Sequence, residues 1–516
     1  MKINKFILTR VLLTFGIAIS VASCSDFLEE ADPSNLNSDS FYKTPQHAEA
    51  AIFAVYAQTR FVANGAGIFS RNWQLLEAPT GTSMTETAQN SDLNNLYSLN
   101  YDGNTAHIVN WWNLLYRTIG QANLVIKNVP GIQMDKVAKS KVLGEAYFLR
   151  AWAYFYAVRL WGDIPLITEP QSAASEDFRP GRATQAAVYD LIVKDLTTAE
   201  TSGLEWMNAN GRVSQAAVKA LLSKVYLTMA GFPLSKGASH FKLAADKSFE
   251  LISYSQSNPS VVGLFPKYAD MRDITQDNKL EHLFMIQFVA DVSENPVQQT
   301  LLPYNKPINA GALGIGTTVP TKQFFNSYET GDLRTKNQEG YFYTSYFQGG
   351  TGAIFELGAP YIFKHFDVRM HGRPGVPGAG RSDLSMMNIR YADVLLTYAE
   401  AQNELGSPTM PAYDALKRIR DRAQLNTPAL GTYNQATFRE AVWRERWYEL
   451  CYEGVTWFDM VRLRKVFNEN TKGFDNFVGH INLSSNQPLQ AKHLLFPLGI
   501  QEMNNNPNLK PQNPGY

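Results

Sequence analysis

Residues 143–165 read LGEAYFLRAWAYFYAVRLWGDIP, and this stretch decides the fold class of the chain. From residue 136 to residue 161, side chains recur at three- and four-residue spacing, which places them along one face of a helix. We expect that face to lie in the core. The helix should end at Gly162, because glycine permits a C-terminal turn and Pro165 disfavours helical geometry at Ile164. The members of this stripe are Leu143, Ala146, Tyr147, Arg150, Tyr154, Ala157, Val158 and Trp161.

One charged residue, Arg150, lies within the apolar stripe. An unpaired buried guanidinium is too costly, so this side chain must meet a carboxylate or several carbonyl oxygens. We favour a structural ion pair over contact with a ligand.

The same stretch carries a resemblance to a known family. Residues 145–151 (EAYFLRA), Tyr154-Phe155 and residues 161–165 (WGDIP) together resemble the signature helix of the SusD/RagB family, which are outer-membrane nutrient-binding lipoproteins of Bacteroidetes-type bacteria. Further matches follow in order along nearly the whole chain. One departure is Thr456, where family members commonly have arginine. The further matches are GRVS at 211–214, GDLR at 331–334, RYADVLL at 390–396, YAEA at 398–401, Glu445-Arg446, Glu449-Leu450, Glu453-Gly454, WFD at 457–459, NPNL at 506–509 and QNPGY at 512–516.

The resemblance implies a mainly α fold, in which a tetratricopeptide-like scaffold of helix pairs carries a loop-rich, irregular ligand-binding subdomain. We expect one SusD-like domain over residues 41–516, with the helical scaffold at about 41–60, 105–255 and 386–470. Helical patterns are predicted for residues 45–60, 106–128, 136–161, 185–200, 213–229, 241–253, 391–404, 411–424 and 435–452.

Two long stretches break the helical pattern. Residues 61–104 are rich in Gly, Ser, Thr and Asn, and residues 256–385 are punctuated by Gly and Pro, with an expected flexible segment at 372–380. Loops of this length inside a compact body are usually functional or mobile. We therefore interpret both stretches as facing the ligand.

The N-terminus reads as an export signal. Residues 1–23 have a basic start and a short apolar run at 11–19, which is too short to span a membrane. Val21-Ala22-Ser23-Cys24 resembles a bacterial lipobox, which implies cleavage before Cys24 and its lipidation; the alternative is an ordinary secretory signal with an incidental cysteine. Residues 24–40 would form the lipidated N-terminus and a linker. Their acidic residues resemble a surface-export signal, so we expect outer-membrane anchoring on the exterior face.

Composition limits the partners and the chemistry. The 516 residues carry 47 basic and 47 acidic side chains without a basic stripe, which argues against nucleic acid as a partner. No zinc-protease, serine-hydrolase or phosphate-loop motif is present, and we predict no catalytic residue, no metal and no cofactor. Glu445 and Glu449 could act as an acid–base pair on a glycosidic bond, but adjacent arginines favour a structural charge network. Cys451 is expected to be a packed residue within a helix.

The irregular stretches supply candidates for a sugar site. A sugar ring has an apolar face and a rim of hydroxyls, so its site needs an aromatic platform beside planar hydrogen-bonding side chains. Trp111, Trp112, Trp443 and Trp447 fall in helical patterns and are assigned to packing. The candidate ligand-binding residues are Arg71, Trp73, Asp92, Asn95, Tyr304 and Tyr346.

These observations favour a surface lipoprotein that captures a glycan. The resemblance implies a partner, a SusC-like TonB-dependent outer-membrane transporter, to which the captured oligosaccharide or polysaccharide is delivered. Two alternatives remain: an oligopeptide cargo handled by the same fold, as in RagB-like members, and, as a third reading, a surface glycoside hydrolase.

Overall fold

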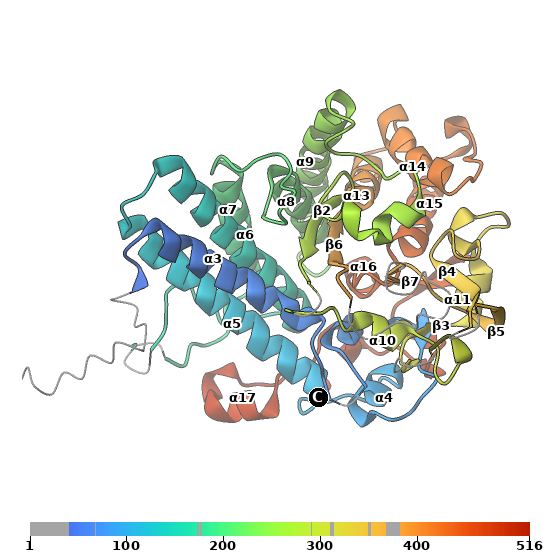
Figure 1. Ribbon diagram of the computed structural model, residues 1–516, viewed down its shortest axis with the longest axis horizontal. Helices are drawn as coiled ribbons and strands as arrows, with labels where there is room; N and C mark the ends of the chain where they lie inside the picture. Colours follow the sequence, from blue (N-terminus) through green and yellow to red (C-terminus); the bar gives the residue numbers. More distant parts are fainter. Residues whose placement is uncertain are drawn as a thin grey trace, which may run out of the picture.

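The computed structural model describes residues 41–67, 69–172, 175, 178–289, 292–309, 314–348, 352–367 and 382–516. The predicted signal peptide, Cys24, the linker and segment 372–380 lie outside the described residues. The fold is mainly α (Figure 1), as predicted. Helices fill the left and the top of the view in Figure 1, and short strands and loops gather at the lower right. No helix in the described ranges combines the length and apolar character needed to cross a bilayer.

The first group of helices forms a continuous stack. Neighbours in the chain pack against each other from α5 to α9, and α3 covers α5 and α6. Side-chain caps fix several starts; the Thr44, Asp135, Thr184 and Ser214 oxygens accept backbone N–H groups of the first helical turn. The bounds are α3 Pro45–Thr59, α5 Ala106–Asn128, α6 Lys136–Trp161, α7 Gln185–Glu200, α8 Gln215–Ala230 and α9 Ala238–Ser257.

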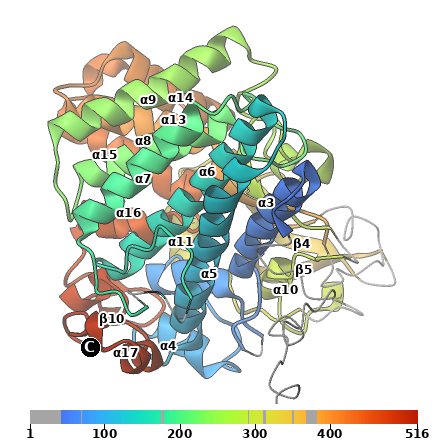
Figure 2. The same cartoon turned by 90° about the vertical axis from the view of Figure 1, so that its left-hand side faces the viewer.

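Helix α6 lies at the centre of this stack (Figure 2). The sequence predicted a single apolar stripe, and this prediction was too narrow. From Phe148 to Trp161 nearly every side chain is buried, because α3, α5, α7 and α8 all contact the helix. Leu143 and Tyr147, which the stripe included, are only half-buried. The helix ends at Gly162, whose φ is +78°.

Arg150 forms the structural ion pair that the sequence predicted. Its Nε and Nη2 atoms each lie 2.8 Å from a carboxylate oxygen of Asp195 on α7, and Nη1 donates to Asn123 on α5 at 2.9 Å. The guanidinium thus ties three helices together within the core.

A second group of helices packs on the first through α13, which contacts α8 and α9. Its bounds are α13 Tyr391–Glu404, α14 Met410–Arg422, α15 Gln435–Leu450 and α16 Thr456–Leu463. Cys451 was placed within a helix, but it is the residue that caps α15. It is fully buried, and burial raises the pKa of its thiol to about 11. Trp111, Trp112 and Trp447 are buried in the main core, as assigned.

All strands pair in antiparallel two-stranded sheets. The pairs are β1 Ser83–Met84 with β3 Val319–Pro320, β2 His282–Ile286 with β6 Met386–Arg390, β4 Phe342–Phe347 with β5 Ile354–Ile362, β7 Lys465–Asn468 with β8 Gly473–Asn476, and β9 Ile481–Asn482 with β10 Gln487–Pro488. Short helices are α4 Ser91–Tyr97, α10 Val297–Leu301, α11 Lys322–Ser327 and α17 Ile500–Asn505. A second, smaller core of aromatic side chains forms around β4 and β5.

A buried ion-pair cluster joins the strand-rich part to the helices. Arg390, at the end of β6, donates through Nε to Glu453 at 2.8 Å and also contacts Glu449 and Glu281. Arg334 donates to Glu445 at 2.6 Å. Glu445 and Glu449 therefore serve the structural charge network that the sequence favoured. The cluster consists of Glu281, Asp332, Arg334, Lys364, Arg390, Arg422, Glu445, Glu449 and Glu453.

Candidate ligand-binding site

The two irregular stretches meet where β1 pairs with β3. Ser83 is opposite Pro320 and Met84 is opposite Val319. Hydrogen bonds from three other segments hold residues 315–318, which directly precede β3. The Gln74 side chain donates to Thr318 Oγ1 at 2.7 Å, the Tyr97 hydroxyl donates to Thr317 O at 2.8 Å, and the Ile315 N–H donates to Gln299 O at 3.1 Å. Segment 315–318 is thus the centre of the candidate site.

Arg71 is linked to this segment through Gln299, which bonds both Arg71 and Ile315. Arg71 is extended and precedes the 3₁₀ helix Asn72–Leu76. Its Nη2 donates to Gln299 Oε1 on α10 at 2.8 Å, while its Nε is buried without a partner among the described residues. Burial lowers the pKa of Arg71, and the charge of Glu294 opposes this effect. The pair presents one guanidinium and one amide, both planar donors suited to hydroxyl groups.

Tyr304 is linked to the same segment through Glu86. Its N–H donates to Glu86 Oε2 at 3.0 Å, and the Tyr361 hydroxyl donates to Glu86 Oε1 at 2.5 Å. The Glu86 N–H in turn donates to Gly316 O at 2.8 Å. The Tyr304 side chain remains 45% exposed. Of the predicted aromatic platforms, only this one has an open ring in the structure.

The structure contradicts the choice of Trp73 as a platform. Trp73 lies two residues after Arg71, in the 3₁₀ helix, but it is 2% exposed and packs in the main core. Tyr346 is 5% exposed and belongs to the second core, where its ring contacts Phe366 with 5.0 Å between centroids. Neither ring offers a face to a sugar. The Gly- and Ser-rich sequence around these residues did not show that both side chains are buried.

Asp92 and Asn95 lie on α4 and remain candidates at the rim. The capping residue of α4, Asn90, donates to Ala66 O, which brings this helix beside the turn that carries Arg71. The Asp92 carboxylate accepts the Ala106 N–H at 3.1 Å and so also supports the start of α5. Both side chains are half-buried.

Sequence reasoning missed three polar residues of the site. Gln299, Glu86 and Tyr361 come from α10, from the loop after β1 and from β5, and nothing in their local sequence distinguishes them. They come together because β1 pairs with β3, β3 lies beside β5, and Gln299 O accepts the Ile315 N–H. Within the described ranges, no group of three or more His, Cys, Asp or Glu side chains is arranged to hold a metal ion.

Glu77 directly follows the 3₁₀ helix Asn72–Leu76, and its carboxyl group is buried. Burial raises its pKa to about 8, although the Gly454 N–H donates to Glu77 Oε1 at 2.7 Å. Between pH 4.5 and about 8, the folded chain therefore holds a proton that the unfolded chain has lost, so this residue's contribution to stability falls as pH rises. We expect Glu77→Gln to raise the free energy of unfolding at pH 8 by on the order of 3 kcal/mol and to leave it unchanged at pH 4.

Urea unfolding at pH 4, 6 and 8 measures this difference. The exposed Glu339→Gln change, in a surface pair with Lys336, is the matched control and should show little effect at any of the three values. If Glu77→Gln raised the free energy of unfolding equally at pH 4 and pH 8, Glu77 would not be protonated in the folded chain as we infer.

A mainly helical scaffold with a few short strands and long loops defines the structural class of this protein. The chain belongs to the SusD family. Residues 335–516 match the family model described as "SusD family", and residues 26–227 match the one described as "Starch-binding associating with outer membrane". A SusD superfamily protein from Parabacteroides distasonis is 34% identical, with a TM-score of 0.84, and the match covers 93% of this chain and all of that one.

Other relatives agree over nearly the full length. The SusD-like protein P2 of Formosa agariphila is 28% identical over 99% of this chain and 100% of its own. A surface glycan-binding protein A from Bacteroides uniformis shares the fold, with a TM-score of 0.73 at 20% identity, over 91% of this chain and 99% of that one.

Proposed function

We propose that this protein is a cell-surface glycan-binding lipoprotein that captures an oligosaccharide or polysaccharide without cutting it. Cys24 would be its lipid anchor in the outer membrane, and it would deliver the glycan to a SusC-like TonB-dependent transporter. The description of the matched family, "Starch-binding associating with outer membrane", and the glycan-binding relative of the same fold support this assignment.

One observation carries the assignment of the binding face. The exposed Tyr304 ring and the Arg71–Gln299 pair are both linked to segment 315–318: Gln299 O accepts the Ile315 N–H, and Glu86 bonds both Tyr304 and Gly316. An open aromatic ring can cover the C–H face of a sugar, while guanidinium and amide groups bind its hydroxyls. Glu86 fixes the backbone of Tyr304 through a charge-assisted hydrogen bond. The site would therefore be partly formed before ligand arrives.

We expect Tyr304→Ala to weaken glycan binding about tenfold, since loss of one ring contact corresponds to about 1.4 kcal/mol. Affinity gels containing a panel of polysaccharides would identify the ligand by retarded migration, and titration calorimetry with its oligosaccharides would give the dissociation constants. The matched control is Phe249→Ala, because Phe249 is 44% exposed but lies on scaffold helix α9.

The same experiment separates the rival functions. Equal binding by the Tyr304 and Phe249 variants would reject this face, and unretarded migration in every gel would reject glycan capture. Tight binding of peptide mixtures instead would favour the oligopeptide alternative. New reducing ends released from the retained glycan would indicate hydrolysis.

A further inference from the structure

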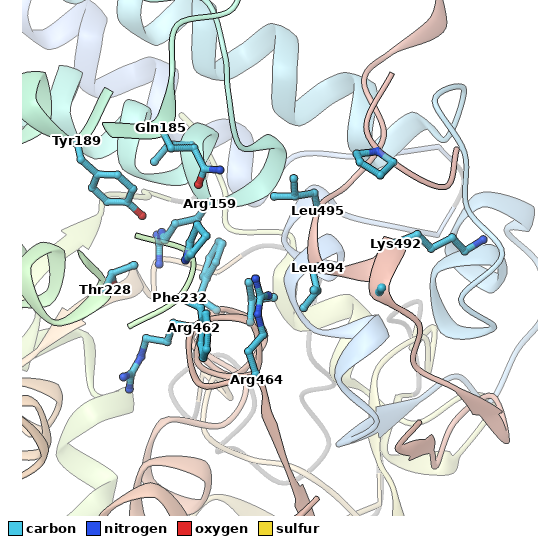
Figure 3. Close-up of a pocket in the computed structure, with 16 residues that line it drawn as sticks. Arg159, Gln185, Tyr189, Thr228, Phe232, Arg462, Arg464, Lys492, Leu494 and Leu495 are labelled. Carbon is cyan, nitrogen blue, oxygen red and sulfur yellow. The ribbon is translucent and has the colours of Figure 1, made fainter. Parts of the chain in front are cut away.

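A mostly apolar cavity with several basic side chains lies among the scaffold helices and the C-terminal segment. It has a volume of about 200 Å³ and is enclosed by the ends of α6 and α8, the start of α7, helix α16 and the C-terminal segment around Leu494 and Leu495 (Figure 3). Most of its wall is apolar, formed by side chains such as Phe232, Phe458 and Val461. Of the residues that the structure describes, no aspartate or glutamate lines it, whereas four basic residues do: Arg159, Arg462, Arg464 and Lys492.

Two of these basic residues do not contribute free charge to the cavity. Arg462 is neutralised by Glu400 and Asp459, with Nη1 at 2.5 Å and Nε at 2.7 Å from their oxygens, and its side chain points away from the centre. The Lys492 side chain runs outward, with Nζ 5.3 Å from the centroid of the Tyr516 ring.

Arg159 keeps its charge and has no ion-pair partner among the described residues, although the more distant charges of Asp459 and Asp393 act to raise its pKa. Its guanidinium is sandwiched between Phe155 and Phe458, 3.6 Å from each ring centroid, and Nε donates to Phe155 O at 2.7 Å. Its terminal nitrogens have no hydrogen-bond or ion-pair partner in the part of the chain that the structure describes. Burial lowers the pKa of Arg159 to about 10, so it remains protonated at neutral pH.

Arg464 is the second basic residue of the cavity that has no ion-pair partner among the described residues. It follows α16 with a φ of +55°, a conformation that a long side chain adopts at a cost. Its Nη1 atom is buried and has no hydrogen-bond partner within the described part of the chain, and its guanidinium carbon lies 5.3 Å from the Phe232 ring centroid. Buried donors are normally satisfied, so an orphaned guanidinium nitrogen at a cavity wall indicates a missing acceptor.

Two neutral donors face the same space. In Figure 3 the Tyr189 hydroxyl and the Gln185 amide point toward Arg159. Neither of these side-chain groups has a hydrogen-bond partner among the described residues. Donors from α6, α7 and the end of α16 therefore converge on one small, largely apolar cavity.

We propose that this cavity is a binding site for a small organic carboxylate with an apolar body. A guanidinium group binds a carboxylate strongly, and an apolar wall with a few polar groups is typical of small-molecule sites. A dry cavity of about 150 Å³ holds benzene, so about 200 Å³ accommodates one ring and a carboxylate. The site is separate from the Tyr304 face and does not depend on the function proposed for that face.

Titration calorimetry with phenylacetate tests the proposal, with phenylacetamide and acetate as comparison ligands. We expect phenylacetate to bind at least tenfold more tightly than its neutral amide, which lacks the charge, and than acetate, which lacks the apolar body. Arg464→Gln should weaken phenylacetate binding at least tenfold. Leu494→Trp, which fills the cavity without removing a charge, should also abolish it.

Arg117→Gln is the matched control, since Arg117 is exposed on α5 and the same charge is lost far from the cavity. It should bind phenylacetate as the wild type does. Absence of phenylacetate binding, equal affinity for phenylacetamide, or unchanged affinity in Arg464→Gln would each overturn the proposal. Glycan retention by Arg464→Gln should be unaltered, which keeps this outcome distinct from that of the Tyr304 experiment.

Discussion

Arg390→Met is expected to lower the free energy of unfolding by about 3–5 kcal/mol, because it leaves three buried carboxylates without their shared cation. Arg390 contacts Glu281, Glu449 and Glu453, and all four side chains are almost completely excluded from solvent. Methionine fills much of the volume but supplies no charge. Arg422 still pairs with Glu449, and Lys364 still pairs with Glu453. Part of the cluster therefore remains in the variant.

Denaturant unfolding followed by tryptophan fluorescence measures this effect. Lys417→Met provides the control, because Lys417 pairs with Asp421 on the exposed side of α14, where ion pairs contribute little. Arg390→Lys should be intermediate, since it restores a charge but not the fork that reaches three partners. A midpoint for Arg390→Met equal to that of the control would show that the cluster contributes nothing to stability.

This cluster also marks the limit of what the sequence predicts. The periodic patterns located the helices well, and the bounds of α5, α6, α7 and α13 agree with those predicted. Local pattern cannot show how many neighbours a helix has, so the centrally packed α6 was read as having one buried face. It equally could not show that Glu281 and Arg390, far apart in sequence, share an ion pair.

The sequence predicted the two irregular stretches that meet here, but it could not show which of their side chains are exposed, and their role in ligand binding stays a prediction. Composition identified both irregular stretches, and the β1–β3 pairing joins them. Burial depends on the three-dimensional path of the chain, however, and this decides between neighbours such as Arg71, which reaches Gln299, and Trp73, which lies in the core. For the same reason the cavity at Arg159 and Arg464 has no sequence signature.

Acidification should destabilise the protein steeply between pH 4.5 and about 2, by roughly 6 kcal/mol from two carboxylates alone. Burial opposes ionisation of Glu449 and Glu453, but for Glu449 the charges of Arg422 and Arg390 outweigh it, and for Glu453 those of Arg390 and Lys364 do. The pKa of each is lowered to about 2. The unfolded chain takes up these protons near pH 4.5, so it binds more protons than the folded chain within this window. Stability is therefore lost as pH falls.

Residues with raised pKa values do not offset this loss. Glu77 and Glu469, whose pKa values are raised by burial to about 8 and about 7, are protonated in both folded and unfolded chains below pH 4. Urea midpoints measured from pH 6 to pH 2 should fall throughout the lower part of that range. Because Arg390 helps to lower both pKa values, Arg390→Met should make the fall begin at higher pH and span a narrower window. A wild-type midpoint that stays constant from pH 4.5 to 2.5 would mean that neither carboxylate is held ionised by the cluster.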